Sequence, residues 1–140
     1  MKMIWYIFLN VLFPLFIGLL CYMFLRPEAF IPKMVFFYTG LWVSLPSETV
    51  YGNLILRFLN NHFADFLWAY AMSHLIFAYG CYIEWNKKLL LMLCVGTGII
   101  MECLMGTFDF VDIFMQWLAI SIAYYKYKSI NEMWRKKYGK

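Results

Sequence analysis

The chain opens with MIWYIFLNVLFPLFIGLLCYMFL (residues 3–25), an apolar stretch that carries no charged side chain. A helix needs about 20 mostly apolar residues to cross the hydrocarbon core of a bilayer, and this stretch is long enough. It is too long for the apolar core of a secretory signal, and it has no A-x-A cleavage site. The stretch therefore predicts a membrane-spanning helix that is kept in the protein.

The composition of the whole chain agrees with a lipid environment. Of the 140 residues, 64% are hydrophobic, 22% aromatic and only 14% charged, whereas soluble domains have about 45–50% apolar and about 25% charged residues. A soluble domain of this length leaves too much of its surface in water to hide so many apolar side chains. The composition excludes a water-soluble enzyme, a disordered chain and a disulfide scaffold, and it predicts one membrane domain.

Three later stretches have the length and polarity expected of further spans: residues 63–83, 89–105 and 111–125. With the first stretch they predict an all-α integral membrane protein with four transmembrane helices in a single domain, residues 1–125. The segment between the first two spans, 34–59, holds only one mostly apolar stretch, the twelve residues Met34–Leu45, before Pro46 interrupts it. Because twelve residues are too few to cross a bilayer, we expect this segment to be re-entrant or interfacial.

Basic residues set the predicted orientation. In a four-span arrangement nine Lys and Arg residues fall on the side of the two termini, most of them in the tail 126–140, and three fall on the other side. Lys and Arg are retained in cytoplasmic segments, so we expect a multi-pass plasma-membrane protein with both termini in the cytoplasm. The basic tail would lie against anionic inner-leaflet lipid. The net charge of +4 then needs no nucleic acid partner to explain it.

Acidic residues mark the candidate site, because a carboxylate within an apolar helix is costly and rarely placed there without a function. In the predicted topology four acids lie near the outer ends of three different helices: Asp65, Glu102, Asp109 and Asp112. Gln116 lies on the same face of the predicted helix as Asp109 and Asp112. We therefore expect these side chains to gather just below the outer surface and to line a polar pocket.

The sequence allows more than one role for several neighbouring residues. Arg57 is the expected counter-charge for Asp65, or the contact for an anionic head group. Asp109 can serve as the N-cap of the fourth helix, because its carboxylate can accept from free backbone N–H groups. His62 either joins the stripe of Asp65 or is an ordinary interfacial histidine. His74 lies about half a turn out of phase with Asp65 and is left out of the site.

Familiar catalytic motifs are absent from the chain. It contains no P-loop, no G-x-G-x-x-G, no H-E-x-x-H and no G-x-S-x-G, so the sequence identifies no catalytic residue, cofactor or metal ligand. An oxygen-rich cluster would suit hard cations such as Mg²⁺, Ca²⁺ or Mn²⁺. The candidate ligand-binding residues are Asp65, Glu102, Asp112, Arg57, Asp109 and Gln116.

The order of the acids resembles a known pattern. An aspartate early in one span (Asp65) is followed by a glutamate late in the next (Glu102), a short turn, and aspartates that open the last span (Asp109 and Asp112). In this respect the chain is similar to the VanZ-like family of small polytopic bacterial membrane proteins. The resemblance covers about residues 60–123.

Two positions depart from that family. Met105 stands where a glutamine often follows the glutamate, and Gln116 stands where an asparagine is usual after the last aspartate. The resemblance implies a role in the bacterial cell envelope, and it links that role to resistance against lipoglycopeptide antibiotics.

Three functions fit these observations. The first is a VanZ-like protein whose outward-facing, carboxylate-lined pocket binds or modifies an amphiphilic envelope molecule. The second is an accessory subunit that packs against a larger membrane transporter or enzyme. The third is a metal-assisted hydrolase or transferase that acts on a lipid-linked phosphate, since converging carboxylates can hold a divalent cation.

Overall fold

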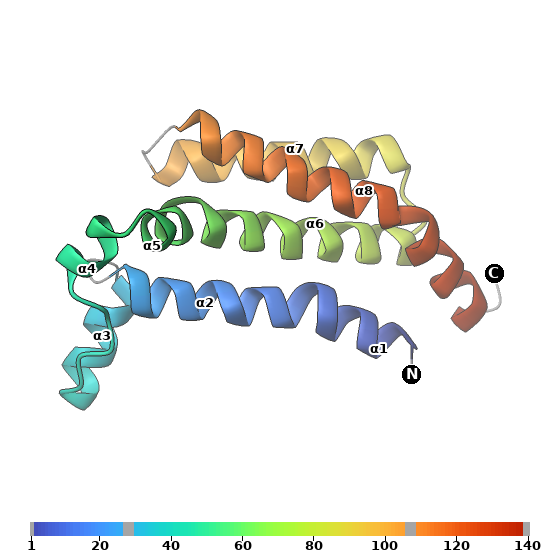
Figure 1. Ribbon diagram of the computed structural model, residues 1–140. Helices are drawn as coiled ribbons and strands as arrows, with labels where there is room; N and C mark the ends of the chain where they lie inside the picture. Colours follow the sequence, from blue (N-terminus) through green and yellow to red (C-terminus); the bar gives the residue numbers. More distant parts are fainter. Residues whose placement is uncertain (1, 27–29, 106–108, 139–140) are drawn as a thin grey trace.

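The computed structural model describes residues 2–26, 30–105 and 109–138, with side chains throughout these ranges except at 2–3, 30–32, 101–105, 133 and 137–138. This part of the chain is all-helical, as the sequence predicts, and it forms six helical segments (Figure 1). In chain order they are α1–η1–α2 (Lys2–Ile7, Phe8–Leu12, Phe13–Leu25), α3 (Phe30–Thr39), α4 (Ser47–Gly52), α5–η2–α6 (Leu54–Phe58, Leu59–Phe63, Ala64–Tyr82), α7 (Lys87–Met105) and α8 (Phe110–Tyr138). The elements η1 and η2 are short π-helical turns within longer helices.

The first helix has the character of a membrane span. Its segment Ile4–Leu25 has 22 residues and a mean hydropathy of 2.3, and 17% of that apolar stretch is buried within the protein. Among the described residues it is the one segment that is long and apolar enough to cross a bilayer by itself. The other three predicted spans fall on α6, α7 and α8, which hydropathy alone does not mark as spans.

The π-helical turn η1 has a local cause in the sequence. Pro14 follows it at the start of α2, and a proline has no N–H to donate to the carbonyl one turn earlier, which belongs to Asn10. A π-helical turn accommodates such a break without ending the helix. The turn places Asn10 on the side of α6, where its side-chain oxygen accepts a hydrogen bond from Tyr70 at 2.8 Å.

Helix α6 occupies the centre of the bundle, with α2 on one side and α7 and α8 on the other (Figure 1). A Cβ atom at Gly80 would lie 2.1 Å from Leu90 Cδ2, so the close packing of α6 on α7 requires glycine here. The buried core joins three helices through Phe77, Ala78, Cys81, Leu90, Cys94, Ile120, Ala123 and Ile130.

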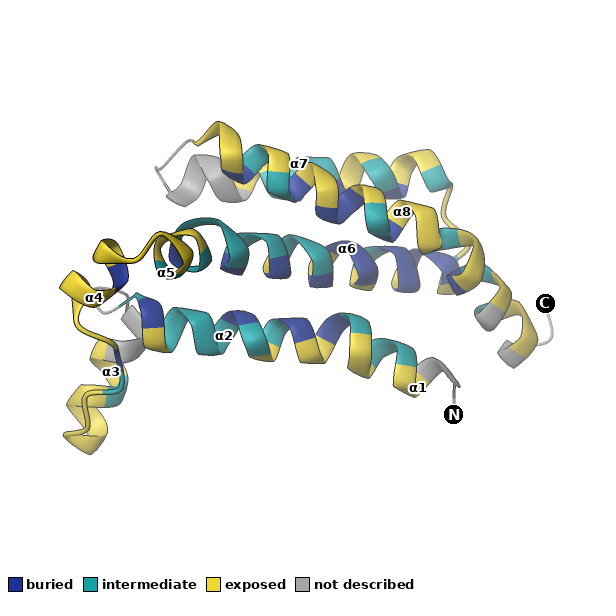
Figure 2. Ribbon diagram, viewed as in Figure 1, coloured by how far each residue is buried: buried dark blue, intermediate teal, exposed yellow. Residues whose placement is uncertain are grey.

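Buried and exposed residues are distributed as expected for a lipid solvent. Buried residues lie along the length of α6, whereas the outer faces of α2, α7 and α8 are largely exposed (Figure 2). These faces carry large apolar side chains, such as Ile4 at 71% exposure and Phe114 at 66%. Soluble monomers rarely expose apolar surface of this extent, which supports the membrane environment predicted from composition.

Helix α3 projects from the bundle at the end opposite to the start of α1 and the end of α8 (Figure 1). It has ten residues and a length of about 15 Å, so it is too short to cross a hydrocarbon core of about 30 Å. The chain after it is attached to the end of α2, because Ser44 Oγ donates to the Met23 carbonyl at 2.9 Å and the Leu45 N–H donates to the Phe24 carbonyl at 2.8 Å. The helices α3 and α4 of this segment are each too short to cross a bilayer, and its re-entrant or interfacial position stays a prediction.

Helix α8 continues beyond the predicted fourth span, 111–125, and ends at Tyr138. The expected division between span and tail at residue 126 is therefore not marked by the end of a helix. The reason lies in the sequence, because no proline or glycine occurs between residues 110 and 138. A charged segment without a helix breaker extends the helix that precedes it.

Candidate functional site

Five ionisable side chains meet at the end of the bundle from which α3 projects. They come from the C-terminal end of α2, from η2, from the first turn of α6 and from the start of α8. We call this group the acidic site; its members are Arg26, His62, Asp65, Asp109 and Asp112. Charges placed at the end of an apolar bundle are costly unless they are paired, so their pairing determines what the site can bind.

Arg26 pairs with Asp65 and holds the end of α2 against η2. Its guanidinium lies 3.3 Å from the Asp65 carboxylate, and the two side chains are 26% and 30% exposed. The same guanidinium donates to the carbonyls of Asn60 at 2.8 Å and Asn61 at 3.3 Å, and to the Tyr22 hydroxyl at 2.8 Å. Arg26 thus connects the first helix to the start of α6 through three partners, Asn60, Asn61 and Asp65.

The sequence-based assignment of Arg57 as the counter-charge of Asp65 is wrong. Arg57 is an exposed residue in the last turn of α5, and Arg26 makes the ion pair instead. The prediction placed Arg57 in the re-entrant or interfacial segment before the second span, whereas α5, η2 and α6 form one continuous helix. Eight residues along a helix correspond to about 12 Å, too far for a salt bridge.

His62 and Asp112 form the second pair of the acidic site. The Nδ1 atom of His62, in η2, lies 2.6 Å from the Asp112 carboxylate in the first turn of α8. The side chains are 16% and 10% exposed. Asp65 interacts electrostatically with both residues, so the two pairs form one cluster. Of the two readings of His62, the structure supports its membership of the Asp65 stripe.

Asp109 acts as the N-cap of α8, one of the two roles that the sequence allowed. Its carboxylate accepts from the Val111 N–H at 2.9 Å, which satisfies one free N–H of the first helical turn. A ligand atom of Asp109 also lies within 4.8 Å of ligand atoms of His62 and Asp112. Asp109 is exposed, so its carboxylate can serve the helix end and a ligand at the same time.

Two predicted site residues remain. One lies deeper in the bundle, and the side chain of the other is outside the described part of the structure. Gln116 is buried at 8% exposure, one turn further into the bundle than Asp112. A Cβ atom at Gly98 would come within 2.6 Å of its amide oxygen, so α7 leaves room for this side chain. Glu102 belongs to α7, one turn beyond Gly98, and its side chain lies outside the described part of the structure. Its place in the pocket therefore stays a prediction.

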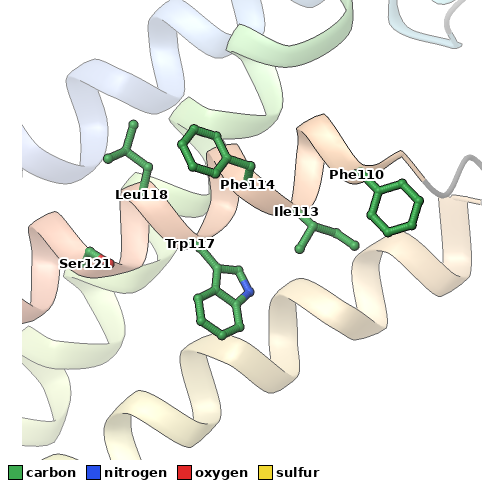
Figure 3. Close-up of a pocket in the computed structure, with 6 residues that line it drawn as sticks. All are labelled: Phe110, Ile113, Phe114, Trp117, Leu118 and Ser121. Atoms are coloured by element: carbon green, nitrogen blue, oxygen red, sulfur yellow. The ribbon is translucent and has the colours of Figure 1, made fainter.

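An open groove runs along the outer face of α8, next to the acidic site. It has a volume of about 450 Å³ and is lined by Phe110, Ile113, Phe114, Trp117, Leu118 and Ser121 (Figure 3). The groove is apolar and contains no member of the acidic site. Phe110 and Ile113 directly follow Asp109 and Asp112 in the chain, so the start of α8 carries a polar face and an apolar face side by side.

A second polar cluster, which sequence analysis missed, joins the first helix to α6 and α8. The Tyr70 hydroxyl and the Lys126 ammonium group both donate to Asn10 Oδ1, at 2.8 and 3.3 Å. The Tyr6 hydroxyl is hydrogen-bonded to Nδ1 of His74, which is fully buried. The sequence signal for this cluster is Asn10, the only amide side chain in the first apolar stretch. His74 belongs to this cluster, which agrees with its exclusion from the acidic site.

Comparisons with protein-family models, with curated proteins and with solved structures give no match to this chain. The VanZ-like resemblance therefore stays a prediction that rests on the acidic residues. Function has to be inferred from the geometry of the acidic site and its surroundings.

Proposed function

We propose that the chain is a four-span plasma-membrane protein whose spans are α1–α2, α6, α7 and α8, with α3 lying in the outer interface. Three observations support this topology. The first helix is apolar along its full length, and the outer faces of the other helices carry exposed apolar side chains. The described chain also begins and ends at the same end of the bundle (Figure 1), where most basic residues lie, as the positive-inside rule requires of a cytoplasmic side.

Single exposed cysteines test this topology in a chain whose four native cysteines are replaced by alanine. We expect a membrane-impermeant maleimide, added to intact cells, to label the two cysteines outside and to miss the two inside until the cells are permeabilised. The outside pair is Tyr51→Cys and Phe110→Cys, and the inside pair is Trp85→Cys and Glu132→Cys. Labelling of Trp85→Cys in intact cells would contradict the topology, because it would place the turn between α6 and α7 outside.

We infer that the acidic site binds an amphiphilic molecule of the cell envelope, as the VanZ-like resemblance implies. The observation that carries this proposal is the juxtaposition at the start of α8. The carboxylates of Asp109 and Asp112 lie on one side, and the apolar groove lined by Phe110 and Ile113 lies on the other. A molecule with a polar head and an apolar chain can engage both surfaces at once. The exposed Arg57 is free to approach an anionic head group from the α5 side.

Conservative substitutions in the site test this function in cells. We expect Asp112→Asn and Glu102→Gln to abolish resistance to a lipophilic cell-wall antibiotic while membrane levels of the protein stay normal. The matched control is Glu48→Gln, which changes an exposed acid of α4 outside the site and should preserve resistance. If both site variants behave like the parent protein, the acidic site is a structural element only.

A further inference from the structure

We infer that the acidic site binds one divalent transition-metal ion through His62, Asp109 and Asp112, with Zn²⁺ as the best-matched ion. One ligand atom from each of these residues lies within 4.8 Å of the other two. The three come from two separate helical segments, η2 and the start of α8. This inference rests on the proposed function only for the position of the site at the outer face.

The donor set favours a transition metal over Mg²⁺ or Ca²⁺. Imidazole nitrogen and carboxylate oxygen are both ligands of Zn²⁺, and three protein ligands leave a fourth position open to water or a substrate. Mg²⁺ and Ca²⁺ prefer sets made only of oxygen. In a tetrahedral site with bonds of about 2.0–2.2 Å, two ligand atoms of one ion lie about 3.3–3.6 Å apart. Asp109 is exposed, so its side chain has room to turn toward the ion.

The existing hydrogen bonds are compatible with metal binding. The ion would replace the hydrogen bond between His62 Nδ1 and Asp112, and these two atoms, now 2.6 Å apart, would separate to about 3.3 Å to share it. Asp109 uses one carboxylate oxygen to cap α8, and a carboxylate has a second oxygen to offer. The metal would therefore not compete with the N-cap that begins the helix.

The charge of the site supplies an independent reason for a cation. Among the described residues of the acidic site, three carboxylates face one guanidinium, and Arg26 is already paired with Asp65. The Asp112 side chain is only 10% exposed, and its partner is an imidazole. Positive charge nearby lowers the cost of burying a carboxylate. A bound dication at His62, Asp109 and Asp112 would provide that charge.

Titration of the purified full-length protein with the metal alone tests the inference. The chelator-treated protein in detergent micelles is titrated with Zn²⁺, and with Mg²⁺ and Ca²⁺ for comparison, by isothermal titration calorimetry. We expect one Zn²⁺ per chain and a loss of affinity of at least 100-fold in His62→Gln and in Asp112→Asn. The control His74→Gln changes a buried histidine outside the site and should leave the affinity unchanged.

Two further results make the test decisive. Asp109→Asn keeps a good N-cap, so this variant should fold normally and still lose about tenfold in affinity if the second oxygen of Asp109 binds the ion. Absence of saturable Zn²⁺ binding, or equal binding by the parent and all three site variants, would overturn the inference.

If Asp112→Asn loses resistance in cells while the parent binds no metal, the metal inference fails and the proposed function stands. If the parent binds Zn²⁺ and the site variants keep resistance, the proposed function fails instead.

Discussion

Replacing Phe77 by alanine is expected to lower the free energy of unfolding by about 3–5 kcal/mol, the usual cost of removing a buried aromatic side chain. Phe77 is fully buried in the core shared by α6, α7 and α8. Its ring packs against Tyr124 and Tyr127, with centroid distances of 6.1 and 5.6 Å. The alanine variant would leave a cavity where three helices meet. Thermal or denaturant unfolding in detergent micelles measures the loss.

The matched control is Phe114→Ala on the outer face of α8, where the side chain is 66% exposed. Its ring is exposed, so its removal leaves no cavity, and we expect a change of only about 0.5 kcal/mol. Membrane helices are held together by packing rather than by the hydrophobic effect, because lipid is as apolar as the side chains. An equal loss of stability in both variants would show that Phe77 does not occupy a packed core.

Arg26→Gln is expected to cost about 2 kcal/mol, less than the 3–5 kcal/mol of a fully buried ion pair because the pair is about a quarter exposed. The substitution removes the positive charge beside Asp65 and the hydrogen bonds that connect α2 to η2. The same change at the exposed Arg57 should alter stability by no more than about 0.5 kcal/mol. Unfolding in micelles, measured for both variants side by side, distinguishes the two arginines.

A double variant separates the ion pair from the other contacts of Arg26. Asp65→Asn removes the carboxylate that Arg26→Gln leaves without a partner, so the double variant should be more stable than the sum of the two single losses predicts. Strict additivity would mean that the two charges do not interact. A larger loss in Arg57→Gln than in Arg26→Gln would restore the sequence-based pairing.

The all-helical class was predictable because the apolar stretches are long and free of strand-like alternation. Helix ends were less predictable. The first helix continues through Pro14 by means of a π-helical turn, and α8 continues into the charged tail as far as Tyr138. In both cases a local signal, a proline or a change of polarity, was weaker than the continuity of the hydrogen-bonded helix. The four-span arrangement stays a proposal for the cysteine-labelling experiment.

The sequence predicted which acidic residues belong to the candidate site, but it did not predict the residues that pair with them. Asp65, Asp109 and Asp112 do lie at one end of the bundle, because helices joined by short connections bring their ends together. Arg26 did not stand out, since it only ends the first apolar stretch in the sequence. The cluster around Asn10 and Tyr70 was missed because its members are spread over three helices.

The sequence by itself determined the apolar helices and the few positions at which charges interrupt them. It could do so because a carboxylate in an apolar helix is costly wherever that helix packs. Only the tertiary structure decided which charges meet. Arg26 and Asp65 are 39 residues apart, and His62 and Asp112 are 50 apart. Such pairs depend on the rotation and register of packed helices, which are determined by contacts such as that of Gly80 with Leu90 and not by local propensity.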